Sequence, residues 1–336
     1  MIDGLEILPV RGIGDVTAGD DLAELIMNAA PWLADGDVLV VTSKIVSKAE
    51  GRLVEVPADG PEREEARQRA LAGETARVVA RRGPTTIVQT HHGFVMAAAG
   101  IDASNVDKTH LVLLPADPDG SAQALRADFL RRGLDVAVIV SDTMGRAWRN
   151  GLTDVALGAA GIEAFRDHRG EIDPYGNELS LTQMAVIDEL SAAAELVKGK
   201  RDRVPVAVVR GYPRTGPGSG AAVLVRDTES DMFSLGTAEA RALGLREAAR
   251  LADGRSGIAD PAAVRRALRT LDGLLTAAVS VQADGVRLSP DRAGAAALIR
   301  LGADAQRLRA ALAAEGVSTV ALIDDDGITL TIGDPS

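Results

Sequence analysis

The stretch Leu134-Asp-Val-Ala-Val-Ile-Val-Ser-Asp-Thr143 joins a short apolar run to a polar exit. Val-rich runs of this length, bounded by polar residues, are typical of strands that are buried on both faces of a sheet. Asp37–Val41 followed by Thr42-Ser43-Lys44, and Val204–Val209 followed by Arg210-Gly211, repeat the pattern. Ligands of open α/β sheets gather beyond the carboxyl ends of such strands. Each exit alone could be an ordinary loop, but the three together predict a parallel α/β sheet with a site at one edge.

Amphipathic stretches separate these strands and predict helices. Asp20–Trp32 has an acidic first turn with apolar residues three and four apart. Pro61–Arg82 is long and charged, with Glu and Arg side chains one helical turn apart, which is typical of a solvated helix face. Thr182–Lys198 is rich in Ala and ends at Gly199, a natural helix C-cap.

The composition changes near residue 238, after which Ala, Arg, Leu and Asp dominate and no aromatic residue occurs. We expect helices near Ala238–Asp253, Pro261–Thr276 and Pro290–Glu315. Two β-prone runs flank Asp324-Asp-Asp-Gly327, and Asp-Gly between such runs is a strong hairpin signal. The three Asp residues lack the spacing of a calcium-binding loop, which favours a plain turn.

Composition narrows the possible functions. At roughly 150 residues per domain, 336 residues predict about two domains. The absence of cysteine excludes a disulfide framework, a thiolate nucleophile, a zinc–thiolate site and an iron–sulfur cluster. A net charge of −11 and 2% aromatic residues disfavour a nucleic-acid partner. The apolar runs are too short to cross a membrane and the N-terminus lacks the pattern of a signal peptide, so we expect a cytoplasmic protein.

Acidic and hydroxyl side chains at two positions suggest a cation site. Asp102 follows an apolar segment, and Asp142 follows a strand and precedes Thr143. Carboxylate and hydroxyl oxygens are the ligands that Mg²⁺ and Mn²⁺ prefer, and substrate phosphates commonly complete their shell. Each Asp taken alone could equally cap a helix or stabilise a turn.

Basic side chains cluster at the same strand exits. Lys44 and Lys48 follow the first strand, and Arg146 and Arg149 follow Asp142 within seven residues. This combination suits recognition of phosphate or carboxylate groups, although a salt-bridged surface loop would look similar. There is no P-loop motif, no nucleophile elbow and no complete dinucleotide fingerprint. The adjacent pair His91-His92 would face opposite sides of a strand and so would not share a metal.

Five blocks of sequence carry a resemblance to a known family. They are Leu8–Gly14 with Gly19–Leu22, Asp35–Arg52, His92–Val106, Ser141–Gly151, and Asp173–Glu178 leading to Ala194–Lys200. In this order and spacing they resemble the coenzyme F420-0:L-glutamate ligases, the γ-glutamyl ligases of F420 biosynthesis. The resemblance covers about residues 5–240, roughly 70% of the chain.

The resemblance implies a fold class and a domain organisation. The fold would be mixed α/β with two lobes, rather than simply doubly wound, and the protein would be an intertwined homodimer. Residues 1–240 would form the ligase domain, and residues 241–336 a small C-terminal α/β extension of unknown role. Those 96 residues are too few for the flavin-binding, nitroreductase-like domain that some actinobacterial relatives carry.

The resemblance also implies a site. The nucleotide would be bound by Ile13, Gly14, Asp15, Val16, Ser43, Lys44, Lys48, Asn105, Lys198, Gly199 and Lys200. One or two divalent metals would be held by Asp102, Asp142 and Thr143. Some relatives carry an acidic or amide residue where this chain has Lys200, which disfavours a second metal held by protein alone. Glu229 and Asp231 are weaker acidic candidates.

The implied reaction is a GTP-dependent ligation. GTP would phosphorylate the lactyl carboxylate of F420-0, the amine of L-glutamate would attack the acyl phosphate, and further glutamates would be γ-linked. Mg²⁺ or Mn²⁺, optionally with K⁺, would serve as cofactor, and no general base is assigned. Two alternatives stay open: a ligase or phosphotransferase of the same scaffold acting on another carboxylate, and a non-catalytic protein that binds nucleotide or F420.

Overall fold

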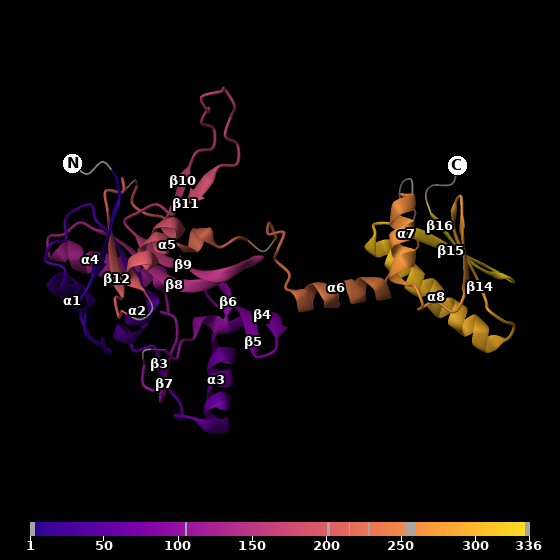
Figure 1. The fold of residues 1–336 in the computed structure, drawn as a ribbon, viewed down its shortest axis with the longest axis horizontal. Helices are drawn as coiled ribbons and strands as arrows, with labels where there is room; N and C mark the ends of the chain where they lie inside the picture. The colour runs from indigo at the N-terminus through magenta and orange to yellow at the C-terminus, as the bar shows by residue number, and fades with distance from the viewer. Residues whose placement is uncertain are drawn as a thin grey trace. The chain divides into compact units, whose positions relative to one another are not determined.

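The computed structural model describes residues 4–104, 106–199, 202–214, 216–227, 229–251, 253 and 260–332. The chain divides into two compact units, Met1–Ala238 and Glu239–Ser336 (Figure 1). No helix in the described ranges is long and apolar enough to cross a membrane.

A five-stranded sheet forms the centre of the first unit. Its strands, in spatial order, are β1 (Glu6–Val10), β12 (Val206–Arg210), β2 (Val38–Thr42), β8 (Ala137–Arg146) and β9 (Arg149–Ala160). Only β2 and β8 pair in parallel, and the other neighbours are antiparallel. The parallel sheet predicted from the strand exits is therefore wrong, and the mixed α/β fold implied by the resemblance is confirmed.

The direction of β12 separates the three polar exits. Ser43 follows β2, and Asp142 lies on β8 at the same edge, where the Ser43 hydroxyl donates to the Asp142 carboxylate at 3.0 Å. Arg210 lies at the opposite edge, where its guanidinium pairs with the buried carboxylate of Asp37 at 2.7 Å. A Val-rich strand looks alike in either direction, so its sequence did not reveal this reversal.

Both faces of the sheet are buried, which explains why its strands are continuously apolar. One face presents Leu39, Val41, Val138 and Val140 to α1 (Leu22–Ala29), α2 (Ser43–Ala49) and α4 (Pro118–Arg131). The alternate residues, among them Val40 and Ile139, pack on the other face against α5 (Val186–Lys198). Period-two alternation therefore divides one apolar run between two cores.

The predicted helix over Pro61–Arg82 is wrong beyond Glu74. Helix α3 ends at Glu74 (Gly60–Glu74), and Thr75–Arg82 forms strand β4. This strand pairs with β5 (Thr85–Thr90), which pairs with β6 (Val95–Ala97). The β-branched residues Val78 and Val79 favour a strand there, in spite of the charged residues around them.

Two further strand pairs and two short helices complete the first unit. They are β3 (Leu53–Glu55) with β7 (His110–Val112), β10 (Phe165–Asp167) with β11 (Gln183–Ala185), and the 3₁₀ helices η1 (Ala98–Gly100) and η2 (Ala222–Leu224). Strands β10 and β11 form the base of an arm, residues 165–185, which projects from the body of the unit (Figure 1). His91 and His92 lie in a turn rather than a strand, and each Nε2 lies 3.0 Å from a backbone carbonyl oxygen.

The second unit is an α/β unit with an antiparallel sheet. Its elements are α6 (Thr237–Ala249), α7 (Pro261–Thr270), β13 (Ala278–Gln282), β14 (Gly285–Ser289), α8 (Ala295–Ala314), β15 (Thr319–Asp324) and β16 (Gly327–Ile332). The predicted hairpin is confirmed, because Asp324 pairs with Gly327 across the turn. The β13–β14 hairpin was not predicted.

Candidate functional site

A cleft of about 880 Å³ lies at the edge of the sheet where β2 ends beside Ser141 of β8. Its walls come from segments that are distant in the sequence: residues 13–18 before α1, Lys44 and Lys48 on α2, Thr143 on β8, Asp154 on β9, Lys198 and Gly199 at the end of α5, and residues 203–205 before β12. Lys44 and Lys48 are four residues apart and therefore lie on one face of α2.

Most of the predicted site residues come together around this cleft. It is lined by Ile13, Gly14, Asp15, Val16, Lys44, Lys48, Thr143, Lys198 and Gly199. Ser43, Asp102 and Asp142 are not among the lining residues. Asp102 contacts Lys44 and Asp142 contacts Thr143, which both line the cleft, and Ser43 contacts Asp142. Asn105 and Lys200 lie outside the described residues.

The carboxylate of Asp142 is held by neutral donors. It accepts hydrogen bonds from the Ser43 hydroxyl at 3.0 Å and from the Thr143 backbone N–H at 2.7 Å. Burial, together with the negative charges of Asp154 and Asp102, raises the pKa of Asp142 to about 6 in spite of these bonds. A cation beside Asp142 would restore the charged form.

Asp102 has a cationic partner. Its Oδ2 lies 2.5 Å from the Lys44 ammonium, and its Oδ1 accepts the Ser104 backbone N–H at 2.6 Å. Burial works to raise the pKa of Asp102, but the hydrogen bonds from Lys44 and Ser104 hold it below its ordinary value. A residue predicted to bind nucleotide thus neutralises a residue predicted to bind metal.

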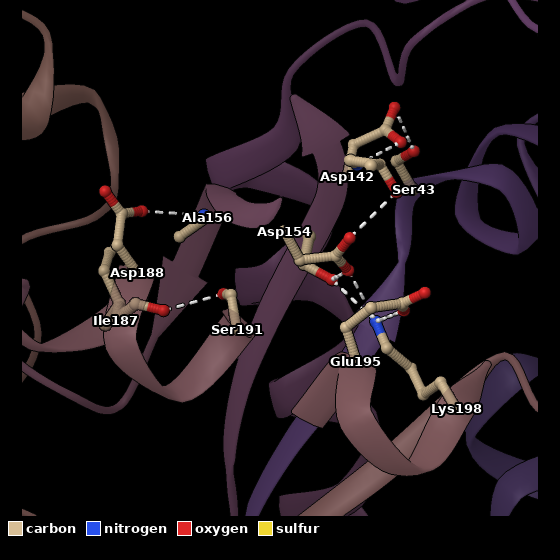
Figure 2. Close-up of polar contacts among 11 residues, drawn as sticks. Ser43, Asp142, Asp154, Ala156, Ile187, Asp188, Ser191, Glu195 and Lys198 are labelled. Atoms are coloured by element: carbon tan, nitrogen blue, oxygen red, sulfur yellow. Dashed lines mark hydrogen bonds and ion pairs between the residues drawn. The ribbon is translucent and has the colours of Figure 1, made fainter. Parts of the chain in front are cut away.

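A buried network of hydrogen bonds and an ion pair lies between β8, β9 and α5 (Figure 2). Asp154 accepts hydrogen bonds from the Thr143 hydroxyl at 2.9 Å and the Ser141 hydroxyl at 3.1 Å, and it pairs with the Lys198 ammonium at 2.9 Å. Sequence reasoning missed Asp154. In the β8–β9 hairpin Asp154 lies opposite Thr143, so a correct prediction of that register would have pointed to Asp154.

Asp142 and Thr143 are consecutive on β8, so their side chains leave the strand on opposite faces. Thr143 lines the cleft and contacts Asp154, whereas Asp142 contacts Ser43. If Asp142 and Thr143 each bind a metal ion, this arrangement means that they bind different ions.

The donor types fit hard divalent cations that are shared with a ligand. Asp102, Asp142 and Thr143 offer two carboxylates and a hydroxyl, which are suitable for Mg²⁺ or Mn²⁺. Within the described residues, no three His, Cys, Asp or Glu side chains are grouped so that they could hold a metal ion. Water and the oxygens of a bound anion would have to supply the other ligands.

The remaining candidates lie apart from this cleft. Arg146 and Arg149 pair across the exposed tip of the β8–β9 hairpin and do not line the cleft. Glu229 is exposed, and Asp231 lies 3.5 Å from the Arg226 guanidinium.

Fold and site together define a mixed α/β protein with a lysine-lined cleft beside two carboxylates. Comparison with known sequences identifies the family. The chain belongs to the F420-0:Gamma-glutamyl ligase family, whose profile matches residues 12–211. The resemblance drawn from the five sequence blocks is thereby confirmed.

Individual relatives match over nearly their whole length. The chain is 41% identical over 249 residues to the coenzyme F420:L-glutamate ligase of Methanothermobacter thermautotrophicus, covering 68% of this chain and 99% of that protein. It is 40% identical over 241 residues to the ligase of the same name from Archaeoglobus fulgidus, covering 68% and 96%. The corresponding ligase of Haloarcula marismortui is 41% identical over 249 residues, covering 68% and 95%.

Replacing Asp142 by Asn is expected to stabilise the metal-free protein at neutral pH by up to about 3 kcal/mol, because the folded state disfavours the charged carboxylate. The folded pKa of about 6 lies above the ordinary value. The native protein therefore loses this stability as the pH rises through about 4 to 6, and the advantage of Asn should grow over that range and then level off. Urea unfolding in EDTA at pH 4, 6 and 8, followed by tryptophan fluorescence, measures it. An Asn variant less stable than the native protein at pH 8 would contradict this account.

Replacing Lys44 by Ala is expected to tighten Mn²⁺ binding to the nucleotide-free protein by about tenfold, because the ammonium competes for Asp102. The same change should weaken binding of a GTP analogue, since it removes a positive charge from the cleft. Electron paramagnetic resonance of free Mn²⁺ and calorimetry measure the two effects. Arg203→Gln, which removes a charge from the same cleft wall, is the control and should change Mn²⁺ affinity by less than about twofold. Equal effects of the two variants would argue against direct competition.

Proposed function

We propose that this chain is a GTP-dependent ligase that joins L-glutamate to coenzyme F420-0 through an amide bond. The observation that carries the proposal is 41% identity over 99% of a relative named coenzyme F420:L-glutamate ligase. The cleft supports it, because it gathers lysines and hydroxyls from segments within the matched residues 12–211.

The chemistry explains why such residues are needed. A carboxylate is a poor acylating agent, so its oxygen first takes the γ-phosphoryl group of GTP, with GDP leaving. The amine of glutamate then attacks the acyl phosphate, forming the amide and releasing phosphate. Phosphoryl transfer depends on positioning and charge neutralisation more than on covalent help from the protein.

Each group of residues has a part in this scheme. The segment Ile13–Val16, Ser43 and the Lys198–Gly199 turn would contact the nucleotide, and Lys44 and Lys48 would offset the charge of its phosphates. Asp102, Asp142 and Thr143 would hold one or two divalent cations. Bound Mg²⁺ or Mn²⁺ would neutralise the phosphate oxygens during transfer.

We also propose that the chain works as a homodimer and that the arm of residues 165–185 makes the contact. Tyr175 and Leu181 on this arm are each 91% exposed, and Ile172 is 64% exposed. Large apolar side chains exposed together mark surfaces that another molecule covers. The partner in this proposal is a second copy of the chain, in keeping with the intertwined homodimer that the resemblance implies.

Replacing Tyr175 and Leu181 together by Ser is expected to weaken dimerisation by at least about tenfold, because both side chains would lose their burial at the interface. Analytical ultracentrifugation over a range of protein concentrations measures the dissociation constant. Ile299→Ser, at an exposed position on α8, is the control and should leave the constant unchanged. An unaltered dimer in the arm variant would place the interface elsewhere.

Incubation of the purified protein with F420-0, L-glutamate, GTP and Mn²⁺ or Mg²⁺ tests the reaction. Mass spectrometry should show F420-0 gaining one or more glutamyl units, with one GDP released for each. Asp142→Asn should reduce turnover by at least about 100-fold, because a ligand of the cation is lost. GDP release without glutamylation would point to another carboxylate substrate. Nucleotide or F420 binding without GDP release would point to a non-catalytic protein.

A further inference from the structure

Asp154 is a buried carboxylate with no part in the scheme above. It lies on β9 and is 3% exposed. Three donors from two elements hold it: the Ser141 and Thr143 hydroxyls from β8 and the Lys198 ammonium from α5. A buried charge is costly unless it is paired and hydrogen-bonded, and each of these contacts lowers that cost.

The two oxygens of Asp154 have separate partners. Oδ1 accepts from the Thr143 hydroxyl, and Oδ2 accepts from the Ser141 hydroxyl and from the Lys198 ammonium. Thr143 and Asp154 are opposite each other in the antiparallel ladder, so their side chains share a face. The Thr143 hydroxyl therefore uses its one hydrogen to donate a hydrogen bond to the Asp154 carboxylate. Towards other groups this hydroxyl can act only as an oxygen acceptor, which is the role of a metal ligand.

Lys198 connects the same carboxylate to the end of α5. Its side chain is 3% exposed, and its ammonium lies 2.9 Å from Asp154, 3.0 Å from the Ser141 hydroxyl and 3.6 Å from Glu195 (Figure 2). Gly199 follows with a φ of +64°, a conformation that favours glycine, and ends the helix at the cleft wall. The position of this wall therefore depends on Asp154.

We propose that Asp154 is a positioning residue of the cleft. It orients the Thr143 hydroxyl as an oxygen ligand for a divalent cation, and through Lys198 it anchors the turn at Gly199. The inference rests on the proposed function, in which Thr143 is a cation ligand. It assigns the Lys198 ammonium to Asp154 rather than to the phosphates of a nucleotide.

Two paired variants of the full chain test this inference with Mn²⁺ alone as the probe. Asp154→Leu with Lys198→Met replaces the ion pair by apolar side chains of similar size, which commonly preserves folding. Asp154→Asn with Lys198→Met also removes both charges but keeps an oxygen that can accept from Thr143. Urea unfolding shows that each variant is folded before metal binding is measured.

The Leu–Met variant is expected to bind Mn²⁺ about 10- to 100-fold more weakly than the native protein, as is typical when a residue that orients a metal ligand is lost. The Asn–Met variant should retain at least about threefold more affinity than the Leu–Met variant, because Thr143 keeps its acceptor. Electron paramagnetic resonance of free Mn²⁺ gives both constants. Native Mn²⁺ affinity in the Leu–Met variant, or equal affinities of the two variants, would overturn the inference.

Asp188→Asn is the matched control. Asp188 is a half-buried carboxylate that accepts the Ala156 backbone N–H at 2.8 Å, and an amide oxygen can replace that acceptor (Figure 2). Its Mn²⁺ affinity should stay within about twofold of the native value.

Thr143→Val separates this inference from the proposed function. Weaker Mn²⁺ binding by the Val variant supports the part that Thr143 plays. Unchanged binding would overturn the inference about Asp154, while glutamylation by the native protein would still establish the ligase. If the native protein does not glutamylate F420-0 but its Mn²⁺ binding depends on Thr143, the proposed substrate is rejected and the positioning role of Asp154 is kept.

Discussion

The parallel pairing of β2 with β8 is the constraint on which the rest of the first unit depends. Thr42 lies opposite Ser141 in this ladder, so the end of β2 lies beside the segment of β8 that carries Asp142 and Thr143. Helix α2 starts directly after β2 and brings Lys44 and Lys48 to that edge. The antiparallel strands β12 and β9 complete the same wall, the first through the residues before it and the second through Asp154. A single register thereby gathers a site from segments that are distant in the sequence.

Three carboxylates meet around this edge, and each is compensated differently. Asp154 is buried and paired with Lys198, and Asp102 is paired with Lys44. Asp142 receives hydrogen bonds from neutral donors, and its pKa is the one that burial raises to about 6. An acidic protein with a net charge of −11 thus keeps a local balance of charge where it is proposed to bind phosphates. In that balance Asp142 is the group that a divalent cation would stabilise most.

The sequence identified the participating residues better than their arrangement. Val-rich runs marked the strands, and the Asp-Gly turn marked the last hairpin, because both signals are local. The direction of β12 was missed, since it is set by partners far away in the chain. The end of α3 at Glu74 was missed because a charged stretch concealed the β-branched residues of β4. Asp154 was missed because its importance lies in a cross-strand register and a contact with α5.

The ion pair between Arg210 and Asp37 holds one end of β12, and the cleft wall lies at the other end. At one end the Arg210 guanidinium pairs with buried Asp37, donates to the Trp32 carbonyl oxygen and lies 5.5 Å from the centre of the Trp32 ring. At the other end the strand emerges from Val204-Pro205 in the cleft wall, where Pro205 has no N–H to contribute to the sheet. The Pro205 carbonyl oxygen nevertheless accepts the Thr42 N–H at 2.9 Å, and Val204 and Val206 are buried. One strand therefore connects the Arg210–Asp37 ion pair at one edge of the sheet to the wall of the cleft at the other, so a shift of its register would move both together.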